Sequence, residues 1–160
     1  MAVTGQQALV TKLKRIRLGL PDVVESDEAK QLLVRRIRAR FDAQRGPDNS
    51  AWEPLKPRTV EIKKRIGAPK PQQALYRFGA LRDSIGVIRG RNAGLLTSNT
   101  GLGFRVGVTD PEVAWYARVQ NYGTDRIPAR PFMGLNELDI RAYRSLASRK
   151  LKKLVETGYA

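Results

Sequence analysis

Residues 116–135 join an aromatic, helix-forming stretch to a rigid Pro-Ala-Arg-Pro-Phe tract, and this junction strongly constrains the fold. The two prolines of the tract fix φ and lack an amide hydrogen, so they exclude a helix there. The pattern predicts a helix over 112–122, opened by Asp110 and Pro111, followed by an extended segment over 128–132. The segment holds no paired carboxylates and no metal-ligand spacing. It therefore indicates a role in shape and contact rather than in chemistry.

Amphipathic helices are expected at the N-terminal end. Apolar residues recur at helical spacing over residues 3–20 until Pro21, which we expect to end the first helix. Ser26 is the predicted N-cap of a second helix that runs to about Gln44. Its apolar stripe falls on every fourth residue: Ala29, Leu33, Ile37 and Phe41. Two such helices in series predict a helical hairpin over residues 1–45.

The C-terminal residues 136–160 predict one further helix. Asn136 and Asp139 have the spacing of a capping box, in which each side chain accepts from the other's backbone N–H. Apolar residues then recur every three or four positions, from Ile140 through Tyr143 to Leu154. This helix and the N-terminal pair would form amphipathic arms on either side of a central region.

The central residues 46–135 mix loops, short helices and strands. A proline-rich loop at 46–58 is followed by a short helix over 60–66 that Thr59 would cap, and by a helix or turn over 73–85. Three segments have strand patterns: 84–89, 95–99 and 103–108. The fold class expected for the 160 residues is therefore a single α+β domain, with a small antiparallel sheet packed with helices.

The absence of cysteine and histidine excludes most enzyme chemistry. Disulfides, zinc-thiolate sites, cysteine nucleophiles and serine triads need residues that this chain lacks. The aspartates are scattered, although a magnesium site built only from carboxylates stays open in principle. We expect no enzyme activity and no cofactor, and a magnesium-dependent nuclease is the alternative in this class.

The net charge of +15 arises from 30 basic and 15 acidic residues, and the two-to-one ratio holds along the whole chain. Such a surface attracts nucleic acid or acidic proteins, and a solvated, self-repelling surface explains it equally well. Arg35, Arg38 and Arg45 lie away from the apolar stripe and form the candidate basic surface. No apolar run is long enough to span a membrane, and the N-terminus lacks the apolar region of a signal peptide, so we expect a cytoplasmic protein.

Rigid aromatic and arginine residues are the candidates for an interface. The predicted subunit or partner interface consists of Trp52, Leu55, Arg126, Pro128, Arg130, Pro131 and Phe132. The alternative for Trp52 and Phe132 is that both side chains fill the hydrophobic core of their own domain. Alternation along an extended tract would then place Phe132 inward and Arg130 outward. For Tyr116 and Tyr122, packing is favoured over stacking on bases.

The order of four motifs resembles the virion morphogenesis family of tailed bacteriophages, the tail-completion proteins typified by Mu-like phages. The motifs are Trp52-x-Pro-Leu-Lys56 with Thr59 and Lys63, the run Leu75–Ile85, Tyr116-Ala117 with Tyr122-Gly123, and Ile127–Leu135. The resemblance covers about residues 30–155. Two departures are Gln120, in a run where the family usually has a histidine, and a long glycine-rich stretch at 90–103.

The resemblance implies a structural virion protein that is assembled in the host cytoplasm and placed in the tail or neck. It would terminate the tail tube and join it to the head connector as a homo-oligomeric ring, with a hexamer as the favoured stoichiometry. Its partners would be tail-tube and connector proteins, with non-specific DNA contact in the channel. A basic nucleic-acid-binding module is the alternative function.

Overall fold

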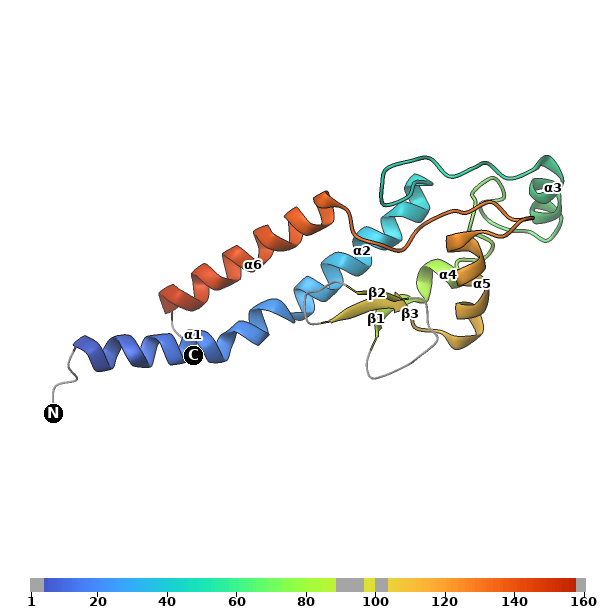
Figure 1. The fold of residues 1–160 in the computed structure, drawn as a ribbon. Helices are drawn as coiled ribbons and strands as arrows, with labels where there is room; N and C mark the ends of the chain where they lie inside the picture. Colours follow the sequence, from blue (N-terminus) through green and yellow to red (C-terminus); the bar gives the residue numbers. More distant parts are fainter. Residues whose placement is uncertain (1–4, 89–96, 100–103, 158–160) are drawn as a thin grey trace.

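The computed structural model describes residues 5–88, 97–99 and 104–157, and it has the α+β architecture expected from the sequence. Three helices lie toward one end of an elongated molecule, and a small sheet with three shorter helices lies toward the other (Figure 1). The long helices are α1 (Gly5–Val24), α2 (Asp27–Ala43) and α6 (Glu137–Thr157). The short ones are α3 (Pro57–Arg65), α4 (Ala80–Asp83) and α5 (Pro111–Tyr122).

The sheet consists of β1 (Ile85–Ile88), β2 (Thr97–Asn99) and β3 (Arg105–Val108), with β3 in the centre and both pairings antiparallel. Ile85 pairs with Val108, and Val87 pairs with Val106. Most of the glycine-rich stretch 90–103, which the sequence predicts as two turns around β2, lies outside the described residues. The predicted strand segments are confirmed at 85–88, 97–99 and 105–108, and residues 89, 95, 96 and 103 of those segments lie outside the described residues.

Helix α2 forms the centre of the core. Its predicted stripe is confirmed, since Leu33, Ile37 and Phe41 are fully buried. Ser26 accepts from the backbone N–H of Ala29 at 3.3 Å, as expected for an N-cap, and Gln44 ends the helix in the left-handed conformation. The sheet packs on one side of α2 and α6 on another, so α2, β1, β3, α5 and α6 share one hydrophobic core.

The predicted N-terminal hairpin is wrong. Helix α2 continues in roughly the direction of α1 instead of folding back on it, and α6 packs along both (Figure 1). Pro21 lies inside α1 rather than ending it. The last turn persists because Val23 is buried and the Tyr143 hydroxyl donates to the Val24 carbonyl at 3.0 Å. Tertiary packing therefore outweighs the local cost of the proline.

The predicted Thr59 cap of the helix after the proline-rich loop is wrong, and the segment 73–85, predicted as a helix or turn, is mostly turn. Helix α3 begins at Pro57, which suits a first helical position, and Thr59 makes no cap. Of the segment 73–85, only α4 is helical, because Leu75 and Gly79 take positive φ values of 58° and 98°. Phe78 consequently lies on the surface, 57% exposed.

Candidate functional site

Trp52 and Phe132 fill the core, which was one of the two alternatives for these residues. Phe132 is fully buried, and Trp52 is 6% exposed with its ring edge against Phe41 at a centroid distance of 5.6 Å. The indole Nε1 donates to the carbonyl of Pro131 at 2.8 Å, which ties the loop to the Pro-Ala-Arg-Pro-Phe tract. These two side chains are buried beneath the surface and therefore do not present a surface to a partner.

Arg130 is also buried, and the prediction that it points outward is wrong. Its side chain is enclosed, and Nε donates to the Glu53 carbonyl at 2.9 Å while Nη2 reaches the Pro54 carbonyl at 3.5 Å. Burial lowers the pKa of Arg130, and the nearby Glu53 carboxylate opposes that shift. Carbonyls in a proline-rich loop have no helix or sheet partner, so a buried cation satisfies them.

Asn121 positions the same tract, although no sequence pattern singles it out. The residue is 6% exposed, and its Oδ1 accepts from the backbone N–H groups of Phe132 and Met133, both at 3.0 Å. Next to it, Gly123 ends α5 with φ of 74°, and a Cβ there would lie 2.7 Å from the nitrogen of Ala129. The Tyr-Gly motif is thus a tight connection between α5 and the tract.

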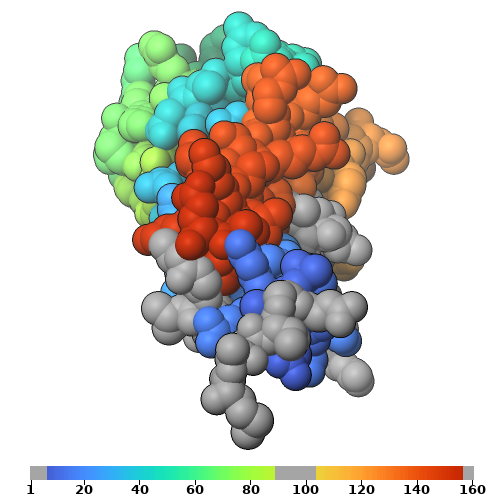
Figure 2. All heavy atoms as spheres, turned by 90° about the vertical axis from the view of Figure 1, so that its left-hand side faces the viewer, coloured from blue at the N-terminus to red at the C-terminus, as the bar shows by residue number. Residues whose placement is uncertain are grey.

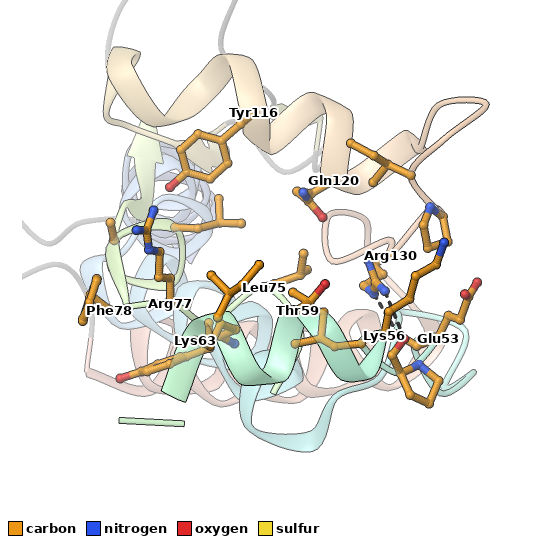
Figure 3. Close-up of a pocket in the computed structure, with 18 of the residues that line it drawn as sticks. Glu53, Lys56, Thr59, Lys63, Leu75, Arg77, Phe78, Tyr116, Gln120 and Arg130 are labelled. Carbon is orange, nitrogen blue, oxygen red and sulfur yellow. Dashed lines mark hydrogen bonds between the residues drawn. The ribbon is translucent and has the colours of Figure 1, made fainter. Parts of the chain in front are cut away.

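A groove of about 850 Å³ opens beside this tract. Its walls are residues 53–56, α3, residues 75–78 with the start of α4, α5 and residues 126–130 (Figure 3). Tyr116 and Gln120 project into it from α5, opposite Thr59 and Lys63 of α3, and Leu75 lies between the two helices (Figure 3). Of the predicted interface residues, Leu55, Arg126 and Pro128 line this groove beside buried Arg130, whereas Trp52, Pro131 and Phe132 are not among its lining residues.

Large apolar side chains in the groove remain open to solvent. Trp115 is 70% exposed, and its ring contacts the Tyr116 ring edge-on. Phe78, Ile62 and Ile66 also line the groove and are among the exposed large apolar side chains. Tyr122, for which packing was expected, is 69% exposed. Trp115 and Tyr122 of α5 therefore face outward, whereas Tyr116 is half-buried.

The charges of the groove are mostly positive. Lys56, Arg77 and Arg126 are exposed, and among the described residues Glu53 is the one acidic residue in the lining. A fourth cation, Lys63, is buried, and its Nζ donates to the carbonyls of Gln73 at 2.6 Å and Lys70 at 3.3 Å. Burial lowers the pKa of Lys63. The buried lysine fixes the loop that forms one wall, and the exposed cations face solvent.

The candidate basic surface of Arg35, Arg38 and Arg45 does not form one patch of available charge. Arg38 donates from Nη2 to the carbonyls of Asp83 and Ile85, both at 2.8 Å, and so joins α2 to the sheet. Arg45 is exposed and donates to the Asn49 carbonyl at 2.9 Å, while Arg35 is exposed. The prediction is corrected for Arg38, whose role is structural.

A buried charge cluster joins α2 to the start of α6. Asp139 accepts from Arg36 Nε at 2.5 Å and from Arg40 Nη2, and only 3% of its side chain is exposed. Arg40 also donates to the carbonyls of Phe132 and Gly134, at 2.7 and 2.8 Å. Burial lowers the pKa of Arg40, whereas Asp139 raises it. The predicted capping box of Asn136 and Asp139 is confirmed within this cluster, at 3.1 and 2.8 Å.

The second exposed apolar surface is on α1. Leu9 and Leu13 are each 57% exposed and Leu20 is 40% exposed, at helical spacing on one side of the helix. Helix α6 lies against α1 (Figure 2), but α1 extends past the end of α6 (Figure 1). We call the surface formed by Leu9, Leu13 and Leu20 the α1 stripe.

The described residues offer neither a metal site nor a membrane-spanning helix. Over the described ranges, no three acidic side chains lie close enough together to hold a metal ion. Within the same ranges, no helix combines the length and apolarity needed to cross a membrane.

Comparison with known proteins gives one match. The model of the phage virion morphogenesis family matches residues 7–152, which include the groove, the buried charge cluster and most of α1 and α6. Neither the curated proteins nor the solved structures provide a match. Because the family model covers most of the chain, this protein belongs to the phage virion morphogenesis family.

Proposed function

We propose that this chain is a non-enzymatic structural protein of the phage tail or neck. It forms a homo-oligomeric ring, with a hexamer as the favoured stoichiometry, that terminates the tail tube and joins it to the head connector. Membership of the virion morphogenesis family supports an assembly role. The tail location, the ring and the connector contact are the parts that we propose.

The observation that carries the proposal is the uncovered α1 stripe. A ring is built from a heterologous interface, in which one patch on each subunit meets a different patch on its neighbour. An apolar helix face that projects past its own core supplies one such patch, because covering it removes apolar surface from water. We therefore place the contact between subunits on α1, since Trp52 and Phe132 already serve their own core.

The test combines light scattering after size-exclusion chromatography with negative-stain imaging. We expect a defined oligomer at high protein concentration, and a monomer when Leu9 and Leu13 are both replaced by glutamate. The control is Leu138→Glu, because Leu138 is 58% exposed and lies outside the α1 stripe, on α6. A chain that stays monomeric at high concentration, with and without tail tubes, would contradict the ring.

Nucleic-acid binding is the second candidate, favoured by the exposed side of α6. Arg141, Arg144 and Lys152 are exposed, and helical spacing places them on one side of that helix. Three phosphate contacts would weaken binding to duplex DNA about 40-fold as salt rises from about 50 to about 200 mM. Fluorescence anisotropy with a labelled duplex measures this dependence, and negligible affinity at the lower salt would exclude the candidate.

A further inference from the structure

The groove is lined by several large apolar side chains that remain exposed to solvent. Trp115, Phe78, Ile62 and Ile66 are 70%, 57%, 48% and 36% exposed, and all four line the same groove. Scattered apolar residues are ordinary on a protein surface, but a contiguous set indicates a binding site. Tryptophan in particular is enriched among the residues that dominate interface energies.

The shape of the groove favours a segment of a macromolecule over a small molecule. Small-molecule sites enclose most of their ligand, whereas the principal apolar side chains here remain largely open to solvent. Helix α3 has nine residues and so supplies a wall about 13 Å long at 1.5 Å per residue. That length fits two to three turns of a helix laid along the groove.

The charges decide which kind of segment fits. Lys56, Arg77 and Arg126 are exposed in the lining, and none of the three forms an ion pair with another described residue. Arg77 instead lies 5.7 Å from the centre of the Phe78 ring. Figure 3 places Arg77 at one end of the groove and Lys56 at the other. Unpaired cations at both ends of an apolar floor complement a ligand that is apolar in the middle and acidic around it.

We propose that the groove binds an amphipathic helical segment of a partner protein whose polar positions carry aspartate and glutamate. That the partner is a virion protein rests on the proposed assembly function; the rest of the inference does not. A second copy of α1 is disfavoured, because Lys12, Lys14, Arg15 and Arg17 would bring like charges to the groove. Nucleic acid is disfavoured, because phosphates would gain little from the apolar floor of Leu55, Ile62 and Leu75.

Trp115 provides a built-in reporter for this binding. The chain has two tryptophans; Trp52 is 6% exposed, whereas Trp115 is 70% exposed and in the groove. Covering Trp115 with a helix removes water from its ring and shifts its emission to shorter wavelength. Trp115→Phe removes the signal from the groove and leaves the emission of Trp52 as the background.

The experiment begins with selection of random 14-residue peptides on the full-length chain. We expect the selected peptides to combine acidic residues with Leu, Phe or Trp at helical spacing. Each selected peptide that lacks tryptophan is then titrated against the chain, beside a copy with its acids replaced by lysine. We expect a blue shift with the acidic peptide and none with the lysine copy.

Variants test whether the groove is the site. Lys56→Glu combined with Arg77→Glu should weaken binding of the acidic peptide at least about ten-fold. The control combines Arg141→Glu with Arg144→Glu on α6, which makes the same change in net charge at exposed positions outside the groove. Ile62→Glu tests the apolar floor in the same assay. All substituted side chains are exposed, so the fold is expected to persist, and circular dichroism checks this.

Several outcomes would overturn the proposal. Selection of basic peptides, or equal weakening by the groove and α6 variants, would show that local groove charge does not select the ligand. A blue shift with a single-stranded oligonucleotide instead of the peptides would assign the groove to nucleic acid. A blue shift on concentrating the chain alone would assign it to a second copy. The oligomeric state of the Leu9/Leu13 variant is measured separately, so failure of the ring and failure of the groove proposal remain distinguishable.

Discussion

Replacing Asp139 by asparagine tests whether the buried charge cluster holds α6 on α2. The substitution keeps the shape of the side chain and removes the negative charge that both Arg36 and Arg40 contact. Arg40 is itself buried at 7% exposure, so it would be left as an uncompensated buried cation. Asparagine retains one acceptor oxygen, which limits the loss to one of the two charged contacts and part of the capping box.

The expected cost follows from these contacts. A hydrogen bond to a charged group contributes about 1.5–3 kcal/mol, and breaking a buried ion pair from one side costs about 3–5 kcal/mol. We expect Asp139→Asn to lower the free energy of unfolding by about 3 kcal/mol, which is the lower end of the range for a broken buried ion pair, because one acceptor oxygen remains. For a chain of this size that corresponds to a fall in Tm of about 6–12 °C.

Urea unfolding followed by far-ultraviolet circular dichroism, at one fixed protein concentration, measures the change. The matched control is Asp27→Asn, which makes the same substitution in the first turn of α2. The Asp27 side chain is 95% exposed and 3.7 Å from Lys30, so its loss should cost less than about 1 kcal/mol. Equal, small effects of the two substitutions would refute the role assigned to the cluster.

Three further predictions concern the tract and α2. Asn121→Ala leaves two buried N–H groups without an acceptor and should cost about 2–4 kcal/mol in urea unfolding. Gly123→Ala places a methyl group against backbone atoms at a positive φ and should lower Tm by several degrees, whereas Gly67→Ala, where the space is open, should cost less. Burial raises the pKa of Asp42, but hydrogen bonds from Arg82 and Lys70 outweigh it and hold that pKa below its ordinary value. The ionised Asp42 carboxylate therefore stabilises the folded state above about pH 4, and this stabilisation is lost as pH falls further. Asp42→Asn should consequently lower stability slightly at pH 7 and by less at pH 2.5, in urea unfolding at both pH values.

Local periodicity explains which parts of the fold were predictable. The stripe of α2 and the alternation of Phe104, Val106 and Val108 concern residues close in sequence, and all are buried as expected. The capping box at Asn136 is likewise a local pattern. The direction of α2 relative to α1 was not predictable, because it depends on α6, more than 90 positions along the chain from α2, packing against both helices.

The candidate site was predictable only in part, for the same reason. The tract around Pro128 and the loop at Leu55 were identified as rigid, and both line the groove. The orientation of Arg130 depends on the carbonyls of a loop more than 70 positions away, as its bond to Glu53 shows. Asn121 gave little signal beyond a polar residue in the last turn of a helix, because its two partners belong to the following tract.

Image reconstruction of the intact phage particle tests the proposed function most directly. We predict a closed ring of copies at the head-proximal end of the tail tube. The α1 stripe should be covered by the neighbouring copy, and the groove should hold a helix from an adjacent virion protein. A particle that lacks the chain, or one in which its copies are separated from each other with α1 open to solvent, would contradict the account.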